Sequence, residues 1–213
     1  MVKVAALPVG RIQANTYAVY NEEGKALIID PGAEADRIID WINVNGWEPQ
    51  AVLLTHGHYD HIGAVDAIRD AFGIDAYIHT KEADFLTDAT LNLSGLTGSG
   101  QGLTQRSAER NWLEMGKKII GDIPFKVAFT PGHSPGHVIY IFEDGEFVIN
   151  GDTVFQGSVG RTDFPGGSHE ELMARIEKEI ISLPHHYRLY SGHGPVTTIA
   201  QEIQTNPFFG KFR

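Results

Sequence analysis

The sequence predicts an α+β fold in which helices cover the outer faces of two packed sheets. Apolar runs of strand length alternate with segments of helical periodicity along all 213 residues. No linker, low-complexity tract or short repeat interrupts this alternation, so we expect one domain over residues 1–213. Several strand-like runs end in a potential metal ligand, and ligand sites gather where strands end and loops begin.

The composition limits the function before any motif is considered. The chain carries ten histidines, no cysteine and a formal net charge of −10. The negative charge disfavours a nucleic-acid or anionic-membrane partner, and the lack of cysteine excludes disulfides, thiolate nucleophiles and cysteine-ligated zinc. The first residues do not resemble a signal peptide, and no run approaches the ~20 apolar residues of a membrane span. We therefore expect a cytoplasmic protein whose surplus of histidine needs an explanation.

The first part of the chain predicts a small sheet. Short strands are expected at residues 2–7, 15–20 and 26–30, and the glycine-containing turns between them favour an antiparallel meander. A helix follows, with acidic residues in its first turn, isoleucines on one face and a stop at Gly46. The next strand, residues 51–55, is a continuous apolar run, which indicates burial on both faces.

The connection after this strand carries the densest group of possible metal ligands. Helical spacing resumes at Ile62, so core packing anchors the connection at both ends. Its polar residues are His56, His58, Asp60 and His61. Alternate residues of an extended segment face the same way, so the first two histidines can share one metal, while Asp60 and His61 are better placed for a second. The alternative, a solvated histidine-rich turn, is unusual at the end of a buried strand.

The middle of the chain is less regular. A strand at 76–78 and a helix at 80–86 precede a glycine-rich stretch, residues 88–110, that shows no periodicity. A loop of this length inside a compact domain is usually functional or disordered. We expect either a flap over the site or a mobile surface excursion.

Two further strand ends supply ligand candidates in the second half of the chain. Strands are predicted at 125–129, 138–142 and 147–150. Two Pro-Gly steps between the first two strands form a rigid double turn that fixes His133 in space. Asp152 follows the third strand after a glycine.

The last quarter predicts a helix, a strand and a closing helix. Ser168 and Glu171 form a capping box for the first helix, and Thr198 caps the second. Between them a strand at 188–191 ends near His193. The aromatic residues after the closing helix can fold back on the domain or bury against a second subunit, so a homodimer is one expectation.

Taken together, these motifs resemble the metallo-β-lactamase superfamily over essentially the whole chain. They occur in the family's order and are similar in particular to its glyoxalase II (hydroxyacylglutathione hydrolase) branch. The matching segments are Thr-His-Gly-His-Tyr-Asp-His at 55–61, Pro-Gly-His-Ser-Pro-Gly-His at 131–137, Gly-Asp-Thr at 151–153 and Ser-Gly-His-Gly-Pro at 191–195. The resemblance is specific for fold and metal site and less specific for substrate, because many reactions share these motifs.

The resemblance implies a four-layer αββα sandwich with two divalent ions in a cleft at one sheet edge. The ligands it implies are His56, His58 and His133 for one ion, Asp60, His61 and His193 for the other, and Asp152 as the bridge. Zinc is expected, with iron and manganese as alternatives, because nitrogen and oxygen ligands without sulfur do not select one metal by affinity alone.

Two segments depart from the longer members of the glyoxalase II branch. Those enzymes carry a C-terminal helical region that helps to hold glutathione, and this chain resembles a short form that lacks most of it. Where they have Gly-Lys followed by aromatic residues near the thiol carrier, this chain has Gly-Arg-Thr-Asp-Phe at 160–164. That stretch also resembles a loop of the persulfide dioxygenases in the same superfamily, so the thiol carrier stays open.

The expected reaction is hydrolysis of a small-molecule thioester, such as hydroxyacylglutathione, by a hydroxide that bridges the two metals. Asp60 is the catalytic candidate, expected to orient this hydroxide and take its proton. Arg161 is the candidate for pairing with a substrate carboxylate, and a surface salt bridge with Asp163 is the alternative. Tyr59 is expected to line the cleft or to pack as an ordinary tyrosine.

Two residues are expected to support the site without touching substrate. His137 lies close to His133 in the sequence, but we expect it to hydrogen-bond within the Pro-Gly turns. Asp30 ends a strand and is expected to hydrogen-bond to the backbone of the metal loop.

Other functions compete with the thioester hydrolase. An iron-dependent persulfide dioxygenase would use the facial set of His56, His133 and Asp152, although the ligands for a second metal are also present. A non-catalytic binding module ranks lower, because a degenerate site would be expected to have lost ligands. A β-lactamase or lactonase is a further alternative, although the cysteine of many lactamase zinc sites is absent.

Overall fold

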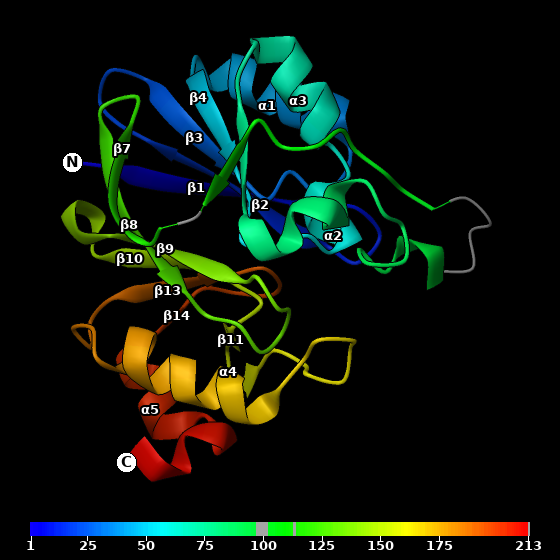
Figure 1. The fold of residues 1–213 in the computed structure, drawn as a ribbon. Coiled ribbons are helices and arrows are strands. Elements are labelled where there is room, and N and C mark those ends of the chain that lie inside the picture. Colours follow the sequence, from blue (N-terminus) through cyan, green and yellow to red (C-terminus); the bar gives the residue numbers. More distant parts are fainter. Residues whose placement is uncertain (97–101, 113, 213) are drawn as a thin grey trace.

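The computed structural model describes residues 1–96, 102–112 and 114–212. Two six-stranded sheets pack face to face, and helices cover the outer face of each sheet (Figure 1). The chain completes the first sheet before it enters the second, so each sheet comes from one half of the sequence. This arrangement confirms the predicted four-layer αββα sandwich.

The first sheet has its strands in sequence order. They are β1 (Lys3–Val9), β2 (Ala14–Tyr20), β3 (Lys25–Ile29), β4 (Glu48–Leu53), β5 (Ala76–His79) and β6 (Arg110–Trp112). β1 to β3 pair antiparallel, which confirms the predicted meander. β3 to β6 are parallel. Parallel strands end at the same edge, so the residues that follow β3 and β4 lie close together.

The second sheet has the order β14-β13-β10-β9-β8-β7. Its strands are β7 (Gly116–Ile120), β8 (Ile123–Phe129), β9 (Val138–Phe142), β10 (Phe147–Gly151), β13 (Arg188–Ser191) and β14 (Thr197–Thr198). Neighbouring strands are antiparallel except β10 and β13, which are parallel. A separate two-stranded hairpin follows β10 and is formed by β11 (Val154–Phe155) and β12 (Ser158–Val159).

Amphipathic helices form the two outer layers. They are α1 (Ala35–Asn45), α2 (Tyr59–Ile62), α3 (Val65–Phe72), α4 (His169–Arg175) and α5 (Ile199–Thr205). α1 and α3 cover the first sheet, whereas α4 and α5 cover the second (Figure 1). α4 continues as a π-helical turn. Of the apolar stripe that helical spacing predicts here, Leu172, Ile176 and Ile180 are fully buried and Leu183 is partly buried.

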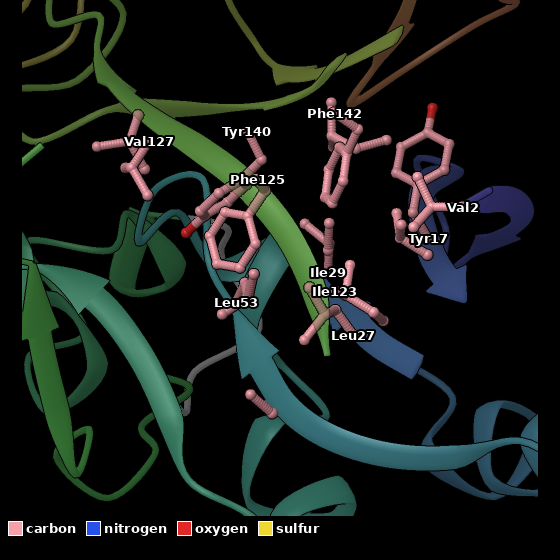
Figure 2. Packing of buried hydrophobic residues seen from close by; sticks show 14 of the residues in the cluster. Val2, Tyr17, Leu27, Ile29, Leu53, Ile123, Phe125, Val127, Tyr140 and Phe142 are labelled. Carbon is pink, nitrogen blue, oxygen red and sulfur yellow. The ribbon is translucent and has the colours of Figure 1, made fainter. Parts of the chain in front are cut away.

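Large apolar side chains fill the space between the two sheets (Figure 2). Leu27, Ile29 and Leu53 come from the first sheet, and Phe125 and Tyr140 come from the second. Burying side chains of this size stabilises the fold by roughly 1.5–3 kcal/mol each. The alternate residues of β3 and β4 pack outward under α1 and α3, so β4 is buried on both faces, as predicted.

Three predicted features need correction. The helix after the metal loop begins at Tyr59 rather than Ile62, because the short α2 precedes α3. The capping box of α4 is only half formed. Ser168 Oγ accepts a hydrogen bond from the backbone N–H of Glu171, but the N–H of Ser168 donates to the carbonyl of Gly132. No predicted strand corresponds to β7, which pairs with β8 through a two-residue turn.

The long irregular stretch of residues 88–110 is described in part. It contains a 3₁₀ turn, Ser94–Leu96, and its Leu93 and Leu103 line cavities beside the possible metal ligands. The predicted flap falls partly on residues 97–101, which lie outside the described residues.

The aromatic residues at the C-terminus fold back on the second half of the molecule. Phe209 is fully buried in the cluster under α4 and α5, and Phe212 packs against the same cluster. Phe208 is exposed. The segment therefore folds back on the domain, which is the first of the two arrangements expected for it. Within the described ranges, no helix combines the length and the apolar character needed to cross a bilayer.

Candidate metal centre

Strands of both sheets deliver the predicted ligand residues to one end of the sandwich. His56 and His58 follow β4 of the first sheet, and Asp60 and His61 lie on α2. The other three follow strands of the second sheet: His133 after β8, Asp152 after β10 and His193 after β13. Pairing of the strands, rather than nearness in the sequence, therefore brings the residues together.

The ligand atoms form two groups, within each of which all atoms lie within 4.8 Å of one another. The first, here called the three-histidine cluster, comprises His56, His58 and His133. The second, here called the mixed cluster, comprises Asp60, His61 and His193.

Asp152 lies between the two clusters. Its Oδ1 is 3.5 Å from Nε2 of His61, and its Oδ2 is 3.5 Å from Nε2 of His133 and 3.7 Å from Nε2 of His193. Gly192 allows this approach, because a Cβ at that position would lie 2.0 Å from Asp152 Oδ1. A single carboxylate therefore reaches both clusters, which is the position expected of a bridging ligand.

Hydrogen bonds decide which ring nitrogen of each histidine faces its cluster. The Thr55 hydroxyl donates to Asp30 Oδ2 at 2.6 Å and lies 3.0 Å from His56 Nδ1, so it must accept a proton from that nitrogen. His61 Nδ1 likewise lies 3.0 Å from Asp30 Oδ2, an oxygen that only accepts. Because Nδ1 carries a proton in both rings, Nε2 is the nitrogen atom that each ring turns toward its cluster.

Two other histidines are oriented in the same way. His133 Nδ1 donates to the carbonyl of Arg161 at 2.8 Å, and His193 Nδ1 faces the carbonyl of Ile12 at 3.3 Å. Their Nε2 atoms therefore face inward. His58 differs, because its Nδ1 faces the cluster, 3.0 Å from His133 Nε2. Each of the five rings thus turns one nitrogen atom toward the other ligand candidates of its cluster.

Several of these inward-facing atoms are buried without a hydrogen bond. Within the part of the chain that the structure describes, His56 Nε2, His61 Nε2 and Asp152 Oδ1 have no hydrogen bond. Leaving a buried polar atom unsatisfied costs about 1–3 kcal/mol. Imidazole nitrogen and carboxylate oxygen are ligands of zinc, iron and manganese, so the donor atoms of both clusters fit divalent cations.

The two clusters differ in charge. Burial lowers the pKa of His56 well below its usual value, and burial together with the neighbouring rings lowers the pKa of His58 to about 3. Burial also opposes a charge on His61, but the carboxylates around it, Asp60 first, outweigh burial and raise its pKa well above the usual value. The pKa of His193 is raised because its hydrogen bond with Asp60 outweighs its partial burial. Burial therefore favours the neutral form of His56 and His58, whereas the surrounding carboxylates favour the protonated form of His61 and His193.

His137 is arranged differently from the ligand candidates. Its Nε2 accepts a hydrogen bond from the backbone N–H of Asp152 at 3.1 Å, and its Nδ1 lies 3.0 Å from Thr130 Oγ1. Both nitrogen atoms are thus engaged inside the protein, and no lone pair is free for a cation. These contacts tie the Pro-Gly loop to the loop of Asp152 and are of the supporting kind expected for this residue.

Asp30 supports both clusters from behind. It lies directly after β3 with a positive φ of 50°, and its Oδ1 accepts from the backbone N–H of Thr55 at 2.8 Å. Its Oδ2 accepts hydrogen bonds from the Thr55 hydroxyl and from His61 Nδ1. Although Asp30 lies within ligand distance of His56 and His61, its oxygens already accept three hydrogen bonds, which suits a positioning role better than metal ligation.

A cavity of about 600 Å³ opens over the ligand candidates. Tyr59 and the apolar Phe155 and Phe164 form part of its wall. Arg161 lines it too, but its guanidinium makes two hydrogen bonds with Asp163, at 2.7 and 2.6 Å, and lies over the ring of Phe164. The salt bridge expected as the alternative for Arg161 is therefore present, and its role toward substrate stays a prediction.

Two further residues, which no sequence pattern marks, support the site. Asn15 Nδ2 donates to the carbonyls of Ser191 and Gly194, which flank His193, at 3.0 Å each. Glu82 is a fully buried carboxylate that hydrogen-bonds to both loops of the three-histidine cluster. Their partners lie between 25 and 179 positions away in the sequence, so no local pattern reveals them.

An αββα sandwich with histidine and aspartate ligands at the strand ends of both sheets defines a class of metal-dependent hydrolases. The chain belongs to the metallo-β-lactamase superfamily, whose family model matches residues 9–193. It is a metallo-hydrolase of that superfamily.

Two curated relatives match this chain over nearly their full length. The probable metallo-hydrolase YqgX of Bacillus subtilis is 43% identical over 206 residues, which cover 97% of this chain and 97% of the relative. The hydroxyacylglutathione hydrolase GloC of Haemophilus influenzae is 34% identical over 210 residues, which cover 96% of this chain and 97% of the relative.

Solved structures share the same fold. The BLEG-1 B3 metallo-β-lactamase is 44% identical with a TM-score of 0.95, and the match covers 97% of this chain and 99% of that chain. TTHA1623 in a di-iron-bound form is 37% identical with a TM-score of 0.86 and coverage of 96% and 99%. ETHE1 from Myxococcus xanthus is 26% identical with a TM-score of 0.77 and coverage of 98% and 85%.

Proposed function

We propose that this chain hydrolyses thioesters of the hydroxyacylglutathione type with two divalent ions, zinc being the expected metal, held by the two clusters. The observation that carries this proposal is the position of Asp152, whose carboxylate lies 3.5 Å from nitrogen atoms of both clusters. Two cations that share a ligand can also share a water. The 34% identity to a hydroxyacylglutathione hydrolase over nearly all of both chains supports the substrate class.

The residues of this chain would have separate roles in the reaction. Two divalent ions, when bound, would lower the pKa of a shared water and polarise the thioester carbonyl. Asp60 lines the cavity, and its Oδ2 lies 3.0 Å from Nε2 of His193. Its carboxylate can orient the attacking water and accept the proton that leaves it. A thiolate is a good leaving group, so the carbon–sulfur bond can break with little acid assistance.

Substrate recognition would come from the wall of the cavity. Arg161 uses Nε and Nη2 on Asp163, which leaves its Nη1 to pair with a substrate carboxylate. Asp163 and the ring of Phe164 hold the guanidinium in place for that contact. Tyr59 and Phe155 would pack along the thiol carrier.

Metal analysis and a substrate panel test this proposal. Protein loaded with zinc, iron or manganese should hold about two ions per chain and turn over S-D-lactoylglutathione. Fully loaded protein that leaves every thioester intact overturns the proposal. The panel should include nitrocefin, because one similar structure is described as a β-lactamase. Hydrolysis of nitrocefin without any thioester turnover would assign the site to lactam substrates.

An iron-dependent persulfide dioxygenase is the second candidate, and residues 160–164 favour it. This loop is joined to the three-histidine cluster, because the Arg161 carbonyl accepts the hydrogen bond of His133 Nδ1. A substrate recognised by the loop would therefore lie beside the cluster. Oxygen consumption with glutathione persulfide, together with one iron per chain, would favour this candidate over the hydrolase. Two metals per chain without oxygen consumption would exclude it.

A further inference from the structure

A buried carboxylate beside the three-histidine cluster has no part in the proposed reaction. Glu82 lies in a 3₁₀ segment, Thr80–Leu86, directly after β5, and none of its surface is exposed. Its hydrogen-bond partners in the described structure are neutral donors rather than cations. They are the backbone N–H of Gly57 at 2.5 Å, the hydroxyl of Ser134 at 2.5 Å and the backbone N–H of Gly136 at 2.7 Å.

These three donors belong to the two loops that carry the three-histidine cluster. Gly57 lies between His56 and His58, and Ser134 directly follows His133. Oε2 of Glu82 faces the first loop and Oε1 faces the second. One carboxylate therefore links a loop of the first sheet to a loop of the second, and it does not line the substrate cavity.

Both loops are shaped to admit the Glu82 segment. A Cβ at Gly136 would lie 2.7 Å from Glu82 Cγ, and a Cβ at Gly57 would lie 2.5 Å from Cβ of Phe85 in the same segment. Glycine at these two positions lets the backbone N–H groups reach the carboxylate without a clash.

The arrangement is specific for a carboxylate. Every partner of Glu82 donates, so the ionised side chain satisfies all three donors. A glutamine would turn its amide N–H toward either Gly57 or Gly136, each of which offers another N–H. Burial raises the pKa of Glu82 to about 7, and the three hydrogen bonds act against that rise. Glutamine is therefore a near-isosteric change that breaks the link between the loops.

We propose that Glu82 is a positioning residue that fixes the two ligand loops relative to each other and so sets the metal affinity of the three-histidine cluster. It does so without contacting metal or substrate. The inference rests on the proposed function only in taking His56, His58 and His133 as the ligands of one ion.

Cobalt(II) binding in single-cluster variants tests this inference. His193→Ala leaves the three-histidine cluster intact, and His58→Ala leaves the mixed cluster intact. Glu82→Gln is added to each background, and the dissociation constant is measured by chelator competition together with the visible spectrum of the bound cobalt. Removing a residue that orients ligands typically weakens metal binding by about 10–100-fold. We expect that loss, with a changed spectrum, in the His193→Ala background, and an unchanged constant in the His58→Ala background.

Glu202→Gln is the matched control. Glu202 is also fully buried and also accepts three hydrogen bonds, from Thr197, Gly157 and Asn206, but none comes from a ligand loop. It should lower the melting temperature of the metal-free protein as Glu82→Gln does and leave cobalt binding unchanged. The inference is overturned if Glu82→Gln weakens cobalt binding equally at both clusters or at neither. It is also overturned if Glu202→Gln weakens cobalt binding as much as Glu82→Gln does.

Ser134→Ala keeps the test decisive if Glu82→Gln does not fold. It removes one of the three donors and leaves the carboxylate in place, so a smaller loss confined to the three-histidine cluster is expected, and no loss overturns the inference. These constants do not depend on turnover. A chain that binds cobalt with this selectivity but cleaves no thioester refutes the proposed activity alone, and a wild-type chain that binds no cobalt refutes both proposals.

Discussion

The three-histidine cluster and the mixed cluster share one end of the sandwich but are prepared differently for a cation. The three histidines of the first cluster are at most 5% exposed, and burial lowers the pKa of His56 and His58. In the mixed cluster, the side chain of His193 is 28% exposed and forms an ion pair with Asp60 at 3.0 Å. The three-histidine cluster is thus closed to solvent, whereas the mixed cluster is partly open and contains an ion pair.

This difference predicts how each cluster is loaded. A cation entering the three-histidine cluster meets two rings, His56 and His58, whose pKa burial lowers, whereas one entering the mixed cluster must displace protons from His61 and His193. Each cluster contributes two residues to the wall of the cavity, His58 and His133 from the first and Asp60 and His193 from the second. We therefore expect one ion to be held tightly and the other to exchange more readily beside the substrate.

The largest expected effect comes from removing the carboxylate that joins the two clusters. Asp152→Asn keeps the shape of the side chain but loses the charge that lies 3.5 Å from His61 and His133. Thioester turnover should fall by more than about 100-fold, because the loss of mere supporting residues already costs 10–100-fold. Elemental analysis should find fewer than two metals per chain. Asp36→Asn, a change at an exposed carboxylate of α1 that does not line the cavity, is the control, and a fully loaded Asp152→Asn protein would contradict the shared-ligand interpretation.

Lowering the pH should weaken metal binding more at the mixed cluster than at the three-histidine cluster. The raised pKa of His61 and His193 means that these rings hold protons in the metal-free protein, so lowering the pH strengthens the proton's competition with the metal. One of the two stepwise dissociation constants should weaken by about tenfold per pH unit for each proton displaced. The other should depend less on pH, because burial lowers the pKa of His56 and His58. Zinc competition titrations across pH measure both constants, and parallel changes would show that the clusters do not differ in this way.

Loss of a support on the open side should give a smaller effect confined to the mixed cluster. Asn15→Ala removes two hydrogen bonds to the carbonyls that flank His193, and leaving such buried groups unpaired costs about 1–3 kcal/mol. The melting temperature should fall, and the weaker of the two metal constants should weaken further. If the tighter constant changed instead, His193 would belong to the other ion.

The smallest change concerns substrate and should leave both clusters intact. Arg161→Lys keeps the charge and the backbone carbonyl that accepts from His133, but it loses the planar fork. KM for thioesters that carry a carboxylate should rise while kcat and metal content stay the same, as expected for a contact made equally in ground and transition states. A thioester without a carboxylate serves as the control, and an equal rise in its KM would remove Arg161 from carboxylate recognition.

The ligand candidates could be predicted because each stands at a position that the local sequence marks. His56 follows an apolar run, His133 lies between Pro-Gly steps, and Asp152 follows a strand and a glycine. Such positions are visible from pattern alone, and the structure brings these residues together. The hairpin of β7 and β8 was also within reach, because its turn is Gly121-Asp122 and both residues have positive φ, a pattern typical of two-residue turns.

The supports could not be predicted in this way. Glu82 and Asn15 are single polar residues whose partners come from distant loops, and no period or spacing distinguishes them from exposed residues of the same type. The half-formed capping box has the same cause, since Ser168 turns its N–H to Gly132, which lies in the loop of His133. Contacts of this kind depend on how the two sheets pack, which only the folded chain determines.

Asp30 is hydrogen-bonded to both halves of the site at once. Its Oδ2 accepts from the Thr55 hydroxyl, which orients His56, and from Nδ1 of His61. A change of charge on one imidazole therefore alters how strongly this oxygen holds the other. Occupation of the two clusters should be cooperative, and by linkage each ion should change the affinity for the other by the same factor.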